Sequence, residues 1–331
     1  MCIRDRITSQ RADVGVMYWD WEKSIPFIPL FIIPYMSIDA FFVAAPFLCR
    51  TQKELTVFGK RVAAGILIAA LFFLIMPKTF AFPRHQVEGI LGPVFKFLYG
   101  FDQPYNLFPS LHIILRTILA HTYSRHTKGA VKIITQIWFS LIGFSTVFVF
   151  QHHVPDIIGG FAIAIFLFYV IPEIDQSYRI IFNRKIGGCY ALIFLLCLAL
   201  SSIHPPWSLI LLWPALSMLL ITLGYWLTGA AVFRKAGGRI PLSSKLLLAP
   251  YLLGQQLYLR SYFYKCRPWD EPVPGLLIGR VLNKEEARQT VKKGVSAVVD
   301  MTAEFSESAP FREISYLNLQ TLDLTCLLYT S

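Results

Sequence analysis

Charged side chains are scarce in this chain. Of its 331 residues only 15% are charged, whereas 55% are hydrophobic, and the mean hydropathy is +0.53. This composition excludes an ordinary soluble domain. Paired cysteine spacing is also missing among the six cysteines, which argues against a disulfide framework or a zinc site. No small-residue cleavage site follows the first apolar stretch, so we expect no cleavable signal peptide.

The hydrophobic residues gather in blocks of about 20, the length that a helix needs to cross a bilayer. The third block is the weakest, because it carries His112 and Arg116. The sequence therefore predicts an all-α polytopic membrane bundle of about seven transmembrane helices, with a truncated α/β fragment at its C-terminal end. The predicted blocks are 25–48, 61–82, 107–124, 131–151, 156–173, 187–203 and 207–229.

The net charge of +11 comes mostly from short loops after the first, third, fifth and seventh blocks. Cytoplasmic loops collect Lys and Arg, so these loops are expected inside the cell and the N-terminus outside, although the basic residues before position 24 oppose this orientation mildly. The chain is then a multi-pass protein of the plasma or inner membrane with a cytoplasmic C-terminus. This charge distribution indicates the bilayer as a partner, and no nucleic acid.

The sequence divides into four predicted parts. Residues 1–24 are a polar lead, 25–229 a membrane domain, 230–272 a juxtamembrane linker with an amphipathic helix over 240–265, and 273–331 an incomplete α/β fragment. In this fragment the patterns predict a strand in GLLIGRVL, a helix in EEARQTVKKG, and strands in VSAVVDMT and ISYLNLQTLDL. Fewer than 60 residues with open strand edges make no stable core, so we expect the rest of a domain to be missing.

Ionisable side chains recur at one boundary of the predicted membrane domain. Under the predicted topology all of them lie at the outer face, where polar groups call for a functional reason. Their convergence predicts a site. These residues are Arg84 in the second gap, Ser110 and His112 at the start of the third block, and Ser145, His152, His153 and Asp156 around the turn between the fourth and fifth blocks.

These residue types suit the cleavage of a phosphate ester. Arg84 offers a bidentate fork for phosphate oxygens. Pro109 and Pro155 stand where helices begin, and helix N-termini direct free N–H groups at an anion. Histidine is a competent nucleophile and general acid near neutral pH, and Asp156 can orient a nearby imidazole. We expect neither a metal nor a cofactor.

The motif PSLH at 109–112, with the spacing S-x6-H-x3-D of Ser145, His152 and Asp156, resembles the type 2 phosphatidic acid phosphatase (lipid phosphate phosphatase) superfamily. That family carries K-x6-RP, PSGH and SR-x5-H-x3-D. The resemblance covers about residues 25–175. It implies a phosphatase in which His152 attacks phosphorus to form a phosphohistidine, and Asp156 supports His152. His112 would protonate the leaving oxygen, and Arg84 and Ser110 would hold the phosphate. His153 is a rival nucleophile without the spacing to Asp156.

The chain departs from the family pattern at three positions: Lys78 is one residue too close to Arg84, His85 replaces the proline, and Thr146 replaces an arginine. The form FPSLH…QHH…D is closer to phosphotransferases that make inositol- or choline-phosphoceramide, which keeps lipid phosphoryl transfer open as an alternative. A non-catalytic phospholipid transporter or scaffold is a third possibility. Arg116, one turn below His112, is a candidate for the missing phosphate-binding charge.

Asp39, inside the first apolar block, is interpreted as a polar residue of helix packing rather than a catalyst.

The segment after 273 resembles the opening of a dual-specificity phosphatase domain, but the signature loop HCxxGxxR of that family is absent from the chain. We therefore expect this segment to be inert.

Overall fold

The computed structural model describes residues 10–102, 105, 107–173, 182–203, 207–323 and 325. Its contacts divide the chain into two compact units, Met1–Glu173 and Ile174–Ser331, here called the N-terminal and the C-terminal unit. The predicted four-part division of the chain stays a prediction. All of the predicted site residues fall within the N-terminal unit.

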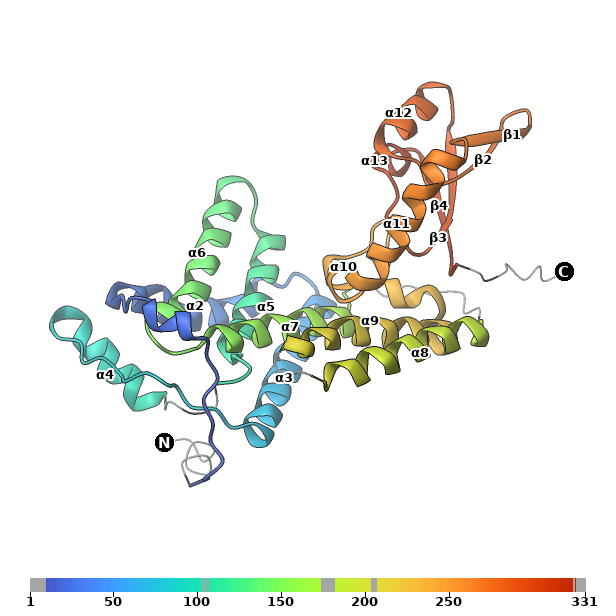
Figure 1. Cartoon of the computed structure of the whole chain (residues 1–331). Coiled ribbons are helices and arrows are strands. Elements are labelled where there is room, and N and C mark those ends of the chain that lie inside the picture. The colour runs from blue at the N-terminus through green and yellow to red at the C-terminus, as the bar shows by residue number, and fades with distance from the viewer. Residues whose placement is uncertain are drawn as a thin grey trace. The chain divides into compact units, whose positions relative to one another are not determined.

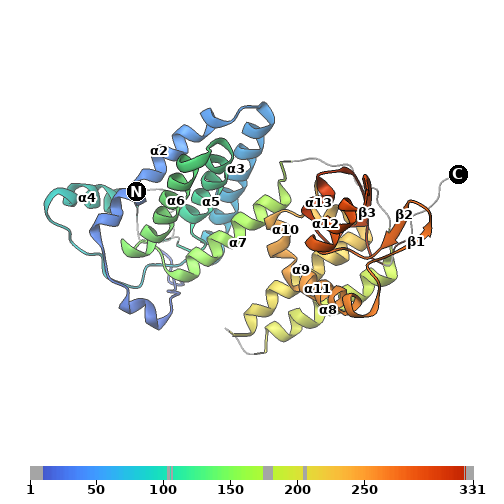
Figure 2. The same ribbon diagram turned by 90° about the horizontal axis from the view of Figure 1, so that it is seen from above.

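The N-terminal unit is a bundle built around α5, which packs against α2, α3, α6 and α7 (Figures 1 and 2). Its centre consists of apolar side chains from all of these helices, among them Ile114, Ile118 and Leu167. The helices are α2 (Ile32–Leu48), α3 (Gln52–Ile75), α4 (Gly92–Phe101), α5 (Leu111–His126), α6 (Gly129–Phe148) and α7 (Val154–Val170), with short 3-10 helices η1 (Asp20–Ser24), η2 (Pro29–Phe31) and η3 (Gly89–Leu91).

Small residues on α7 allow it to approach the start of α5 closely. A Cβ atom on Gly160 would lie 2.7 Å from the backbone oxygen of Ser110, and one on Gly159 would lie 2.7 Å from the ring of Phe108. A larger residue at Gly160 would require the backbone to move, and one at Gly159 would require the Phe108 ring to move. The N–H group of Ser110 donates to the backbone oxygen of Asp156 at 3.0 Å. This packing brings two predicted motifs, PSLH and the stretch that ends in Asp156, side by side.

Five helical segments in the described part of the chain are long and apolar enough to cross a membrane, which indicates a membrane protein. The predicted count of seven is not confirmed. The third and fifth predicted blocks form α5 and α7, of 16 and 17 residues, which are shorter than a full span. The second block was placed too late, because α3 begins at Gln52, where Thr51 caps it by accepting from the N–H of Glu54. The five candidate spans are Pro29–Leu48, Gln52–Ile75, Gly129–Phe148, Arg184–Ser201 and Trp207–Phe233.

In the C-terminal unit, α8 (Arg184–Ser201) packs along α9 (Leu212–Leu223) (Figure 1). Short helical segments η4 (Trp207–Leu211), η5 (Gly224–Thr228) and η6 (Gly229–Phe233) flank α9. The predicted amphipathic stretch forms α10 (Leu242–Leu247) and α11 (Ala249–Lys265).

The strands and the helix predicted after residue 273 are present. A hairpin pairs β1 (Trp269–Val273) with β2 (Leu276–Gly279), and β3 (Ala297–Thr302) runs parallel to β4 (Ser315–Thr321). In the chain, α12 (Lys284–Lys292) lies between β2 and β3, and α13 (Ala309–Arg312) lies between β3 and β4. The buried Lys235 ammonium donates to Asp300 on β3 at 2.6 Å, which ties this small sheet to the segment after η6. The resemblance of this region to a dual-specificity phosphatase is not shown.

Candidate active site

A cavity of about 420 Å³ lies in the N-terminal unit, and both His112 and His152 line it. Its wall contains both polar and apolar side chains. The cavity-lining residues are Tyr35, Met36, Ile38, Asp39, Phe42, Ile66, Phe73, Leu98, Asp102, Tyr105, Leu107, Leu111, His112, Leu115 and His152.

His152 is held in the turn between α6 and α7. Its N–H group donates to the backbone oxygen of Thr146 at 3.0 Å, and its side chain is buried. Nδ1 of the ring has no hydrogen-bond partner among the described residues, but it lies 3.7 Å from Oδ2 of Asp156. The opposite edge of the imidazole carries Nε2, and His152 lines the cavity.

Asp156 is fixed by its position in the first turn of α7. It is the N3 residue of that helix, and its Oδ2 accepts a hydrogen bond from the N–H of His153 at 2.9 Å. A carboxylate at N3 that reaches back to the N-cap backbone is half of a capping box. The H-x3-D spacing therefore has a local cause, because the bond that begins α7 also aims the carboxylate towards His152.

His153, the rival nucleophile, is engaged on both ring nitrogens. Its Nε2 accepts from the N–H of Ala81 at 3.1 Å, so Nδ1 carries the proton and donates to Glu22 at 3.0 Å. The ring stacks on Phe80 with the centroids 4.3 Å apart. Burial lowers the pKa of His153 against the raising effect of Glu22, in keeping with a neutral imidazole. Both ring nitrogens of His153 are thus occupied by protein partners in this arrangement.

Glu22 is a residue whose importance the sequence did not reveal. It comes from η1, is 2% exposed, and accepts from the N–H of Val154 as well as from His153. The N-terminus of α7 therefore directs an N–H group at an internal carboxylate, where a substrate anion was expected. Glu22 also accepts from the N–H of Trp19, three residues earlier, as a local helix cap does. The sequence around residue 22 predicts this cap but not the contact with His153.

His112 is the second residue of α5 and stacks against Tyr35 of α2, with ring centroids 4.4 Å apart and planes inclined by 12°. Its Nε2 is buried and makes no hydrogen bond within the described ranges. Ser110, whose side chain is fully buried, caps α5 by accepting from the N–H of Ile113 at 3.3 Å. Ser110 thus orients the helix that presents His112, and it does not line the cavity.

Like Ser110, the other three residues predicted to bind phosphate do not line the cavity. Arg84 donates to the backbone oxygens of Tyr99 and Asp102 and lies over the Tyr99 ring. Arg116 donates to the backbone oxygen of Phe139 on α6 at 2.6 Å, and the Ser145 hydroxyl donates to that of Ile142. Arg84 does contact a cavity-lining residue, because it donates to the backbone oxygen of Asp102.

Four cavity residues were missed or interpreted differently from the sequence: Tyr35, Asp39, Asp102 and Tyr105. Tyr35 and Asp39 are four residues apart on α2 and therefore share one face, a pattern that could have been noticed. Asp39 lies on the cavity wall, although the sequence predicted that it packs between helices. Among the described lining residues there is no Lys or Arg, so the formal charge of the wall comes from carboxylates.

This geometry agrees with a comparison against known families. Residues 42–170 match the family model of the PAP2 superfamily. The matched region contains Arg84, His112, His152 and Asp156, while Glu22, Tyr35 and Asp39 precede it. No curated protein and no solved structure matches the chain. The match supports a PAP2 membrane domain and, with it, a phosphatase-type function on lipid phosphates.

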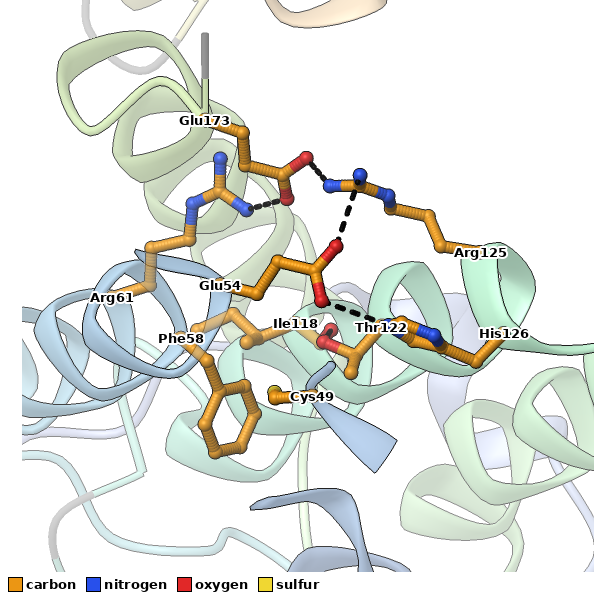
Figure 3. Close-up of a pocket in the computed structure, with 9 residues that line it drawn as sticks. All are labelled: Cys49, Glu54, Phe58, Arg61, Ile118, Thr122, Arg125, His126 and Glu173. Atoms are coloured by element: carbon orange, nitrogen blue, oxygen red, sulfur yellow. Dashed lines mark hydrogen bonds and ion pairs between the residues drawn. The ribbon is translucent and has the colours of Figure 1, made fainter. Parts of the chain in front are cut away.

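At the other end of α5, ionisable side chains surround a space of only about 20 Å³ (Figure 3). Arg61, which is 5% exposed, donates to Glu173 at 2.8 Å and to the backbone oxygen of Ile171, and Arg125 also pairs with Glu173. Glu54 pairs with Arg125 and His126. Because the carboxylates and guanidinium groups neutralise one another, this cluster links α3, α5 and the end of α7 and offers no free charge to a substrate.

A metal centre finds no support in the geometry. The described residues contain no group of three or more His, Cys, Asp or Glu side chains placed to hold an ion.

Proposed function

We propose that the N-terminal unit hydrolyses a lipid phosphate ester through a phosphohistidine on His152. The observation that carries this proposal is the joint placement of His112 and His152 on one cavity, with Asp156 beside His152. Nε2 of His152 attacks phosphorus while the bond from phosphorus to the lipid oxygen breaks, and protonated His112 gives its proton to that oxygen. Neutral His112 then takes a proton from water, which attacks phosphorus and releases phosphate and free His152.

Asp156 stabilises the positive charge that His152 acquires when it bonds to phosphorus. A carboxylate of this kind acts by orienting the ring and balancing its charge, without itself becoming protonated. The apolar wall, with Ile66, Phe73 and Leu115, suits the chains of a lipid substrate. In the proposed topology the cavity belongs to the extracytoplasmic side and the C-terminus is cytoplasmic.

A specific observation favours a second candidate, transfer of the phosphoryl group to another lipid or headgroup. A phosphate monoester carries nearly two negative charges at neutral pH, and the described cavity wall has carboxylates but no Lys or Arg to meet them. A phosphodiester carries only one negative charge and is repelled less. Diesters are the donors in headgroup transfer, so the wall suits this reaction. The implied donor is a phospholipid, and the acceptor an alcohol.

The two candidates separate in one assay of the purified full chain without added metal. Radiolabelled phosphatidic acid, a polyprenyl phosphate and phosphodiester lipids are each incubated with and without a hydroxyl-bearing acceptor. Hydrolysis releases the labelled headgroup phosphate whether or not the acceptor is present. Transfer gives a new labelled product, the phosphorylated acceptor, only when the acceptor is present. Binding of these lipids with no turnover by the wild-type chain, and no difference in the His152→Ala variant, would instead indicate a transporter or scaffold and reject both reactions.

A further inference from the structure

Asp39 is the one charged side chain of α2, and it stands near the middle of that helix. A carboxylate at membrane depth is costly unless it faces a partner or a polar cavity. Asp39 lines the cavity that holds His112 and His152, and its carboxylate makes no hydrogen bond or ion pair to any other described residue. It is therefore a hydrogen-bond acceptor presented to whatever occupies the cavity.

The depth of Asp39 relative to the histidines follows from how α2 runs. The N–H of Ile28, just before α2, donates to the backbone oxygen of Phe148 at the end of α6, next to the turn that holds His152. Further along, the backbone oxygen of Phe41 accepts from Tyr123, near the end of α5. The helix α2 thus leads away from the His152 turn and into the bundle.

Asp39 lies one turn farther into the bundle than the Tyr35–His112 stack. Four residues of α-helix correspond to about 6 Å along its axis. The neighbouring wall residues on this side are apolar, among them Ile38, Phe42 and Ile66. Consider a lipid whose phosphate lies at the histidines and whose chains lie against the apolar wall. The atoms that follow its phosphate-bearing carbon then lie beside Asp39.

A carboxylate at this place repels phosphate and has no use for ester carbonyls, which are also acceptors. It is satisfied by a hydroxyl or an amide N–H, and hydrogen bonds to a charged partner are the stronger ones. We propose that Asp39 accepts a hydrogen bond from a hydroxyl or amide N–H that the lipid carries beside its phosphate-bearing carbon. Asp39 thereby selects such lipids over those with only ester or hydrocarbon groups there. This inference rests on the proposed function for the position of the phosphate.

The test uses two lipids that differ in a single donor: a 1-acyl lysophosphatidic acid with its free hydroxyl, and the same molecule with that hydroxyl O-methylated. Their affinities are measured on the full-length His152→Ala variant, so that turnover does not interfere, and on that variant with Asp39→Leu or Asp39→Asn added. A hydrogen bond to a charged group contributes about 1.5–3 kcal/mol, so the hydroxyl lipid should bind roughly tenfold or more tightly to the chain that keeps Asp39. In Asp39→Leu this ratio should fall to about one.

Asp39→Asn keeps the size of the side chain and serves if the leucine variant fails to fold; its ratio should also fall, by at least about threefold, because the charge is lost. Thr135→Val is the matched control. Thr135 is half-buried on α6 and does not line the cavity; its hydroxyl donates to the backbone oxygen of Val131, and its replacement should leave the ratio unchanged.

An equal affinity for the two lipids while Asp39 is present, or a preference that persists after its replacement, would overturn the inference. The proposed reaction is tested separately by turnover of the chain with and without His152. If turnover depends on His152 but the preference is absent, only the role of Asp39 fails. If turnover survives His152→Ala, the proposed function fails, whatever the binding data show.

Discussion

Nδ1 of His152 lies 3.7 Å from Oδ2 of Asp156. This is longer than a typical N–H···O hydrogen bond of 2.7–3.2 Å, yet short enough for the carboxylate to stabilise a positive imidazole. The same oxygen already accepts from the N–H of His153, so the carboxylate is fixed and closing the gap requires movement of the His152 ring. Asp156 thus has two functions, one in beginning α7 and one in the proposed reaction.

Asp156→Asn separates these two functions. The asparagine oxygen can still accept from the N–H of His153, so we expect the thermal unfolding temperature to change little. The charge that balances the phosphohistidine is lost, so turnover should fall by about 100-fold or more. Steady-state kinetics with a lipid phosphate and thermal unfolding in detergent measure the two effects. A variant that keeps its turnover would contradict the proposed role of Asp156.

The neighbouring histidines should respond in opposite ways to replacement by alanine. His152→Ala removes the proposed nucleophile and should lower turnover by at least about 1000-fold with little change in stability. His153→Ala removes a buried ring that bonds Glu22 and Ala81, so it should lower stability by about 1–3 kcal/mol. The folded fraction of this variant should retain turnover. Thermal unfolding and activity per folded molecule test the pair, and the reverse pattern would make His153 the nucleophile.

His112 should matter in proportion to how much the leaving oxygen needs a proton. With an alkyl lipid phosphate, His112→Ala should lower turnover by about 100- to 10,000-fold. With an aryl phosphate such as p-nitrophenyl phosphate, whose leaving group departs as an anion, the loss should be far smaller. The comparison is made on one preparation of the variant. Equal losses on both substrates would show that His112 acts in another way, for example by holding Tyr35 in place.

The ion-pair cluster around Glu173 should contribute to stability and not to chemistry. Arg61, which is buried, and Arg125 each pair with Glu173, and Glu173→Gln removes this shared carboxylate (Figure 3). Breaking a buried pair costs about 3–5 kcal/mol, and the partial exposure of Glu173 reduces this. We expect a clear fall in unfolding temperature in detergent. The control is Lys23→Gln in the exposed pair with Asp20, which should have almost no effect; similar results for both variants would show that the cluster is not stabilising.

The sequence predicted those parts of the site that depend on local spacing. The interval from His152 to Asp156 is one helical turn, and a proline and an acidic residue in the first turn mark the start of α7, so these residues were accessible from the pattern alone. The same is true of His112, because Ser110 is a cap residue directly before an apolar helix. The strands and the helix after residue 273 were found for the same reason, since their alternation is local.

The remainder depends on contacts between distant segments, which no spacing encodes. Glu22 reaches His153 across 131 residues, and Arg84 is turned towards the backbone of Tyr99 and Asp102, although its residue type suited a phosphate. Asp39 could be interpreted as packing or as function until the cavity placed it. The boundaries of α3 were missed because charged residues between Gln52 and Arg61 hide the first turns of an otherwise apolar helix.

The most direct test of the account is to trap the covalent intermediate. The purified full chain is mixed briefly with a lipid phosphate labelled at phosphorus, quenched in alkali, which preserves a phosphohistidine and cleaves a phosphoserine, and analysed by peptide mass spectrometry. We expect label on His152 in the wild-type chain and none in His152→Ala. With a labelled aryl phosphate, His112→Ala should accumulate more label, because hydrolysis of the phosphohistidine is slowed when no His112 takes the proton from water. Label on another residue, or turnover without any labelled protein, would contradict the account.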